Sequence, residues 1–116
     1  MSDINSEVIL NASAEIIADK RTIQIKTEYK EIKLKLPTTR EVAERLHVPH
    51  YYVLPALSGM EESGILTREE RVGIWTTDKG TKILIRLMTE KFSEKCGEFI
   101  NPDILKALTN YSVEPL

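Results

Sequence analysis

The residues from 36 to 80 constrain the fold most, because they combine a strong helix start with several turn signals over a short distance. Thr38 and Glu41 have the spacing of a capping box, in which each side chain accepts a hydrogen bond from the other residue's backbone amide. Apolar residues then follow at helical spacing, at Val42, Ala43 and Leu46. A short helix with one apolar stripe needs packing partners, so the segment predicts a helix inside a larger packed unit.

A second helix is expected after a tight turn at positions 47–48. Pro49 keeps the first helix from continuing, because the residue before a proline disfavours helical backbone. The second helix should begin near Pro49 or His50 and end at Gly64, since glycine readily takes the left-handed conformation that closes helices. Pro55 would then lie in its early turns and produce a mild kink.

Two short β-prone runs follow at 65–70 and 74–77, around a turn at 71–73 that ends in glycine. Runs of this length predict a compact β-hairpin. Helix, turn, helix and hairpin in this order are typical of a winged helix-turn-helix, in which one helix enters a DNA groove and the hairpin is the wing. We therefore expect a helix-turn-helix over 38–64 and a wing over 65–77.

The residues after the wing predict a further helix with a broad apolar stripe. Thr77 or Asp78 can cap it, and apolar side chains recur every three or four positions as far as Phe99. A small domain has little else to cover so broad a stripe, so a partner subunit is the economical explanation. We expect helices over 78–111 to form a homodimer. The expected interface residues are Leu84, Leu87, Met88, Phe92 and Phe99.

The segments that flank this region are less regular. Residues 5–19 have apolar positions at helical spacing and predict a first helix. Residues 22–36 fit either a strand or a helix. We favour extended structure for 32–36, where lysines alternate with aliphatics, because a strand there would complete a three-stranded wing sheet. Asn101 and Pro102 start a last short helix that folds back on the core or on a partner.

Length and composition indicate one domain over residues 1–116, mainly α-helical with a small β-hairpin. No apolar run approaches the ~20 residues that span a bilayer, and the acidic N-terminus lacks the basic flank of a secretory signal, so we expect a cytoplasmic protein. The single cysteine, Cys96, cannot form an internal disulfide, and with two histidines the chain offers no credible zinc ligand set. Catalytic spacings and phosphate-binding loops are also missing, so we expect neither an enzyme nor a cofactor.

The distribution of charge is more informative than the net charge of −2. The net charge is −4 over residues 1–19, +5 over 20–40, −3 over 41–66, +1 over 67–82 and −1 over the remainder. Positive charge is therefore concentrated before the helix-turn-helix and around the wing, not on the second helix.

Two motifs resemble the PadR and MarR groups of winged-helix transcriptional regulators. Residues 54–66, LPALSGMEESGIL, resemble the PadR pattern of an aromatic or aliphatic residue, Pro, any residue and Leu, followed by Leu, Glu, two residues, Gly and Leu. Residues 75–80, WTTDKG, resemble the end of the wing and the start of the next helix. The resemblance covers about 38–88 and implies homodimers that bind palindromic operators and respond to a small-molecule effector in the dimer interface. Those families usually place basic or polar residues after the Pro-x-x-Leu element, whereas Ser58, Gly59, Glu61 and Glu62 stand here.

Candidate DNA contacts follow from position and chemistry. The amino-terminal end of the second helix offers hydrogen-bonding groups and flat rings, the first helix crosses the DNA backbone, and the wing can hold phosphate or enter a minor groove. Packing of the two tyrosines, and pairing of the wing arginines with Glu69 and Glu70, are the alternatives, and Arg45 can pair with Glu41. The candidates are Arg40, His50, Tyr51, Tyr52, Arg68, Arg71 and Lys79.

Our leading hypothesis is a homodimeric regulator that binds double-stranded DNA in a sequence-specific manner. The competing hypothesis uses the same fold as a protein-interaction module without DNA binding, motivated by the acidic second helix. Winged helices serve both purposes, so the fold alone does not decide between them.

Overall fold

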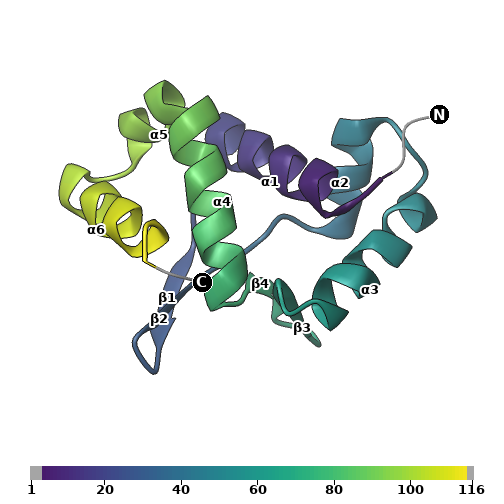
Figure 1. The fold of residues 1–116 in the computed structure, drawn as a ribbon. Coiled ribbons are helices and arrows are strands. Elements are labelled where there is room, and N and C mark those ends of the chain that lie inside the picture. The colour runs from purple at the N-terminus through teal and green to yellow at the C-terminus, as the bar shows by residue number, and fades with distance from the viewer. Residues whose placement is uncertain (1–3, 115–116) are drawn as a thin grey trace.

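The structure is a computed structural model that describes residues 4–114. Most of this part of the chain is helical, and its strands form two small antiparallel pairs. Two long helices cross at the centre, and both hairpins project from one side of the helical body (Figure 1). The helices are α1 (Ser6–Lys20), α2 (Thr39–Leu46), the 3-10 turn η1 (His50–Tyr52), α3 (Leu54–Glu62), α4 (Asp78–Lys91), α5 (Ser93–Phe99) and α6 (Pro102–Ser112), and the strands are β1 (Ile25–Glu28), β2 (Glu31–Leu34), β3 (Leu66–Glu69) and β4 (Gly73–Thr76).

Helix α2 starts as its sequence predicts. The Thr38 hydroxyl accepts from the Glu41 amide at 3.1 Å, and the Glu41 carboxylate accepts from the Thr38 amide at 3.0 Å, so the capping box is confirmed. His47 ends the helix in the left-handed conformation with φ of 57°. Val42 and Ala43 are buried, which attaches this short helix to the core.

The expectation for the second helix was wrong at its start. Residues His50–Tyr52 form a separate 3-10 turn, and α3 begins only at Leu54. Pro55 therefore lies in the first turn of α3, where its missing amide removes no intrahelical hydrogen bond. The predicted kink at Pro55 has no basis in this arrangement. Gly64, with φ of 74°, follows the end of α3 as expected.

The expected hairpin over 65–77 is present. Strand β3 pairs antiparallel with β4, with Leu66 opposite Thr76 and Glu69 opposite Gly73. The turn places Arg71 at φ of 67° and Gly73 at φ of 124°. A Cβ at Gly73 would lie 2.8 Å from Cε of Lys35, so glycine here also admits a neighbouring side chain.

Residues 22–36 are extended, and most of them form a second hairpin. Strand β1 pairs antiparallel with β2, with Ile25 opposite Leu34. The favoured extended structure over 32–36 is confirmed, but the third strand of a wing sheet is not. The chain after β2 meets β4 through the single bridge Lys35–Trp75, and the Leu36 amide donates to the Ile74 carbonyl at 2.8 Å.

The long apolar stripe is buried by the chain itself. Helices α1 and α6 and strand β2 pack against α4, and Leu84 and Met88 are 0% and 2% exposed. The prediction of one continuous helix was wrong, because α4 ends at Lys91 and α5 starts at Ser93. Phe92 and Phe99 pack partly buried against the same core, as does Leu87. The apolar stripe therefore gives no reason to expect a partner subunit, because the chain itself covers it.

Ion pairs connect α1 to α2 and α5. Arg45 pairs with Glu15 and Asp19 at 3.3 and 2.6 Å, and not with Glu41, the partner considered from the sequence. Glu41 instead pairs with Lys20. Hydrogen bonds from Lys95 and Arg45 hold the pKa of the Asp19 carboxyl below its usual value, as they favour its charged form.

Helix α6 is anchored to the start of α4. The Tyr111 hydroxyl donates to the Asp78 carboxylate, which also pairs with Lys82 at 3.2 Å. The Tyr111 hydrogen bond lowers the pKa of Asp78, while burial and this bond raise the pKa of Tyr111 to about 12. At the other end of α4, burial raises the pKa of the Cys96 thiol, consistent with a structural role. No helix within residues 4–114 is both long and apolar enough to cross a membrane.

Candidate nucleic-acid interface

A groove separates the start of α2 from the β3–β4 hairpin. Residues 35–39 form one wall and residues 68–74 the other, and we call it the hairpin groove. Lys35, Arg68 and Arg71 bring positive charge to it, against the carboxylates of Glu69 and Glu70. The groove therefore joins two segments, around α2 and the hairpin, in which the sequence predicted phosphate contacts.

The two arginines of the hairpin have different surroundings. Arg68 donates from Nε and Nη2 to the same carboxylate oxygen of Glu61, at 3.2 and 2.9 Å, and from Nη2 to Ser58 Oγ at 3.2 Å. The alternative of pairing with Glu69 or Glu70 was wrong for Arg68, because its partner lies on α3. Arg71 is exposed at the tip and has no ion pair within residues 4–114. Arg71 is thus the hairpin arginine whose charge is available to an external anion.

The start of α2 adds, next to the groove, another arginine without an ion pair to any described residue. Arg40 is exposed in the first turn of α2, and no other described residue pairs with it. Its neighbour Thr39 lines the groove and also contacts the 3-10 turn, with Thr39 Oγ1 and His50 Nε2 2.5 Å apart. This contact fixes the position of the 3-10 turn relative to α2.

The 3-10 turn presents two aromatic rings to the outside. Tyr51 is 65% exposed and Tyr52 40% exposed. Their ring centroids lie 5.0 Å apart with an interplanar angle of 68°, an edge-to-face pair. Val53, which follows them, is fully buried and anchors the turn. The alternative that both tyrosines serve only for packing does not fit these exposures.

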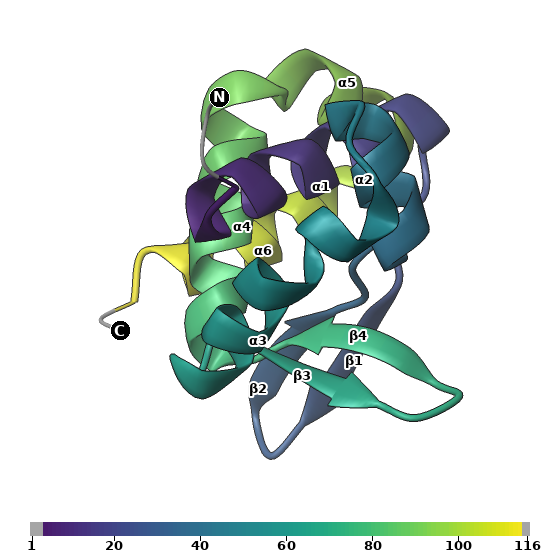
Figure 2. The same ribbon diagram turned by 90° about the vertical axis from the view of Figure 1, so that its right-hand side faces the viewer.

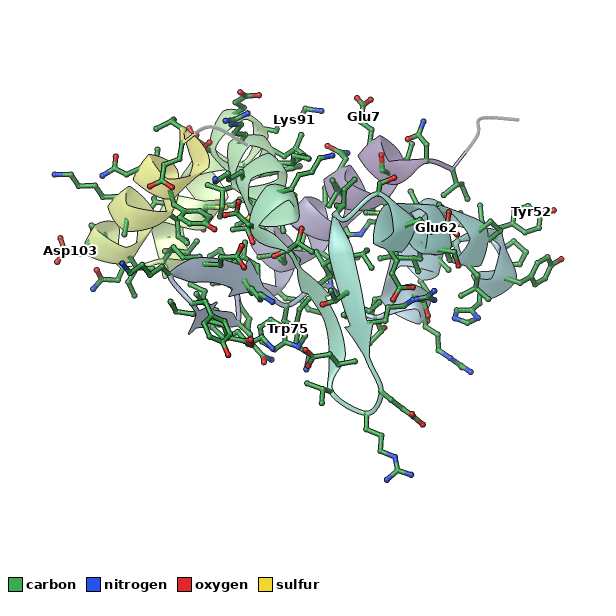
Figure 3. The ribbon with its side chains drawn as sticks, turned by 60° about the horizontal axis from the view of Figure 1, so that its bottom comes forward. Glu7, Tyr52, Glu62, Trp75, Lys91 and Asp103 are labelled. Carbon is green, nitrogen blue, oxygen red and sulfur yellow. The ribbon has the colours of Figure 1, made fainter. Side chains whose placement is uncertain are left out.

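Figure 3 shows how far the hairpin and the 3-10 turn lie from each other. In Figure 3 Trp75 lies at the root of the hairpin that comes forward, and Tyr52 lies at the far end of the molecule beyond it. Lys79, the remaining predicted contact, is exposed in the first turn of α4 but does not line the groove. Of the predicted contacts, Arg68 and Arg71 therefore line the groove, while Arg40 follows the groove residue Thr39 in the chain. His50 contacts Thr39, Tyr51 and Tyr52 belong to the same 3-10 turn, and Lys79 lies apart.

Two important residues of this surface were not predicted. Lys35 lies in the groove and packs its stem over Gly73. Glu61 neutralises Arg68 from α3. The alternation of lysines over 32–36 was a signal for Lys35, whereas the Glu61–Arg68 pair depends on how α3 packs against β3.

The acidic face of α3 borders the same surface. Glu61 and Glu62 are exposed, and α3 itself contains no basic residue. Phosphates are therefore repelled from the carboxyl end of α3 and attracted to Arg40 and the hairpin tip. Among residues 4–114, no group of three or more His, Cys, Asp and Glu side chains is placed to hold a metal ion.

Comparison with known proteins adds no family assignment. No protein-family model matches the chain, and neither the curated proteins nor the solved structures contain a significant match. The resemblance to the PadR and MarR groups therefore stays a prediction that rests on the two motifs.

Proposed function

We propose that the protein is a winged helix-turn-helix DNA-binding protein that regulates transcription. The observation that carries the proposal is the hairpin groove, which contains Lys35 and Arg71, while Arg40 directly follows its wall residue Thr39, and neither arginine has an ion pair within residues 4–114. The order α2, turn, α3 and β3–β4 hairpin supports the same conclusion. A cytoplasmic location is part of the proposal, as for the bacterial and archaeal regulators that the chain resembles.

In this proposal most of the affinity comes from phosphate contacts. Arg40 contacts the backbone where α2 crosses it, and Arg71 contacts phosphate or a minor groove from the hairpin tip. Arg68 is held by Glu61 in an exposed pair, which is a weak constraint of about 0–1 kcal/mol. A phosphate in the hairpin groove can therefore compete with Glu61 for Arg68.

Sequence readout is assigned to the 3-10 turn and not to the exposed face of α3. His50 and the two tyrosines offer donors, acceptors and ring faces, whereas Glu61 and Glu62 repel the backbone on either side of a groove. Among major-groove edges, carboxylates can accept only from the amino groups of cytosine and adenine. We therefore expect modest sequence preference, with Tyr52 as the residue that alters it.

Paired variants test the contact assignment. Arg71→Ala should weaken binding to a labelled duplex about eightfold at 0.1 M salt, because one phosphate contact contributes a slope of about 0.9 in log affinity against log salt. Lys91→Ala is the matched control, since it removes one cation near the upper edge of the view, away from the groove (Figure 3). Fluorescence anisotropy measures both. Equal affinities for the two variants would contradict the assignment.

A protein-interaction module is the second candidate, and one observation favours it. The exposed tyrosines of η1 lie next to an α3 that exposes Glu61 and Glu62 and uses Glu61 to neutralise Arg68. Aromatic rings beside carboxylates suit a basic protein surface. The two functions respond oppositely to Glu62→Lys, which should strengthen DNA binding by adding a cation and weaken binding of a basic partner.

The homodimer and the small-molecule effector are further predictions of the resemblance. A dimer would place two equivalent surfaces about 34 Å apart on successive major grooves. Its interface excludes Leu84 and Met88 unless the core opens, so only the partly exposed Leu87, Phe92 and Phe99 of the predicted set are available. Sedimentation of the protein alone and with DNA measures the assembly.

A further inference from the structure

The tip of the β1–β2 hairpin has a backbone conformation that its residues do not favour. Tyr29 and Lys30 form the two-residue loop between the paired Glu28 and Glu31, and their φ angles are 51° and 68°. Loops with positive φ at both positions are usually built from Asn-Gly, because these residues enter the left-handed region most easily. Tyr29 is also 96% exposed, so packing does not hold its ring. Folding alone therefore does not explain this loop sequence.

The same hairpin has more lysines than glutamates, with Lys26, Lys30 and Lys33 against Glu28 and Glu31. Lys26 and Lys33 stand directly opposite each other, an arrangement of like charges that weakens strand pairing. Lys26 has carboxylate partners in Glu28 and Glu69, at 3.1 and 3.5 Å. Within residues 4–114, neither Lys33 nor Lys30 at the exposed tip has an ion pair. Their positive charge is available to an anion outside the chain.

The β1–β2 hairpin is fixed to the β3–β4 hairpin. The bridge Lys35–Trp75 joins the two, and the Leu34 amide donates to Thr76 Oγ1 at 2.8 Å. The Lys26 ammonium lies 4.3 Å from the centroid of the Trp75 ring. Figure 2 shows both tips projecting beyond the same side of the helical body. The two hairpins are therefore joined near Trp75 and point their tips in different directions, so a ligand that contacts both tips must be long.

We infer that the β1–β2 hairpin is a second DNA-contacting element that touches the same duplex as the β3–β4 hairpin. Lys30 and Lys33 donate to backbone phosphates, and Tyr29 presents its ring and hydroxyl to the groove edge. A duplex is the occupant that we commit to, because Lys30 and Lys33 have no ion pair among the described residues and the hairpin over 25–34 has three lysines against the two glutamates Glu28 and Glu31, a net charge of +1. The inference rests on the DNA binding proposed above.

The test exchanges the loop for one that favours the turn. The double variant Tyr29→Asn with Lys30→Gly places the preferred residues at both left-handed positions, so its thermal midpoint should rise. Its affinity for duplex DNA should nevertheless fall at least about eightfold at 0.1 M salt, and the slope of log affinity against log salt should shrink by about 0.9. Fluorescence of Trp75, the single tryptophan, checks that the junction of the hairpins is unchanged.

Two further variants sharpen the result. Lys33→Ala removes the like-charge pair with Lys26 and should also weaken DNA binding without loss of stability. Lys91→Ala is the control and should bind as the natural protein does.

The outcomes separate the inference from the proposed function. If the natural protein binds DNA and the loop variant binds equally well, the inference is overturned and the proposed function stands. If the loop variant loses both stability and binding, the loop is structural and the inference is again overturned. If the natural protein does not bind duplex DNA at low salt, the proposed function and the inference fall together.

Discussion

Replacing Leu84 by alanine tests whether the stripe of α4 is covered within one chain. Leu84 is fully buried, with α1, α6 and β2 packed around its helix. Removing such a side chain leaves a cavity and typically costs 2–5 kcal/mol, and we expect about 3 kcal/mol. At about 4 °C per kcal/mol for a domain of this size, the thermal midpoint should fall by roughly 12 °C. Leu87→Ala, at a partly exposed position one turn on, should cost about 1 kcal/mol.

The dependence on protein concentration decides the interpretation. If Leu84 is buried within one chain, the loss of stability on Leu84→Ala is the same in dilute and concentrated samples. If it lies between subunits, each tenfold dilution lowers the stability of the natural dimer by roughly 1.4 kcal/mol, and the variant forms a folded monomer. Urea unfolding at two widely separated concentrations, followed by circular dichroism, measures both. A midpoint that moves with concentration, together with a folded monomeric variant, would refute our account of the core.

Three further predictions concern the packing around α4. Gly80→Ala should destabilise the protein by about 3 kcal/mol or more, because the new Cβ would lie 1.9 Å from the Ile65 carbonyl oxygen. Gly97→Ala on α5 is the control: its new Cβ has no atom within 4 Å, so alanine should stabilise the helix by about 0.5–1 kcal/mol. Urea unfolding measures both variants. Folding lowers the pKa of Asp78, so its carboxylate stabilises the folded protein fully at a pH above its unfolded pKa, which is about 3.9. This stabilisation is lost as the pH falls through the lower pKa of the folded state. The loss of unfolding free energy caused by Asp78→Asn, measured at neutral pH, should therefore become smaller below about pH 4. The Cys96 thiol should react slowly with a thiol reagent at pH 7 and rapidly in denaturant, and fast reaction of the folded protein would disprove its burial.

Local signals predicted most of the elements because their causes are local. The capping box at Thr38 depends on residues three apart, and the hairpin over 65–77 depends on β-prone runs around a glycine. The predicted start of the second helix was wrong for a reason that is also local in the sequence. A start near Pro49 or His50 put Pro55 beyond the first turn, whereas proline is best tolerated within it, and a helix that starts at Leu54 satisfies that preference.

The unpredicted features depend on contacts between distant segments. The apolar spacing of α4 continues into α5 because both helices face one core, so periodicity could not reveal the break at Phe92. The periodicity of apolar residues also indicates that the stripe of α4 is buried, but it does not show whether the same chain or a partner subunit buries it. The pairs of Arg68 with Glu61 and of Arg45 with Asp19 form only after elements pack, so the charge available at the candidate site could not be obtained from sequence positions.

Affinity for duplex DNA as a function of salt tests the central claim most directly. Three cations without an ion pair among the described residues, Lys35 and Arg71 in the hairpin groove and Arg40 next to its residue Thr39, predict a slope of log affinity against log salt of about −2.7 or steeper, so a tenfold rise in salt should weaken binding roughly 500-fold. Contacts from the β1–β2 hairpin would make the slope steeper. No measurable binding at low salt, or binding that does not change with salt, would contradict the account.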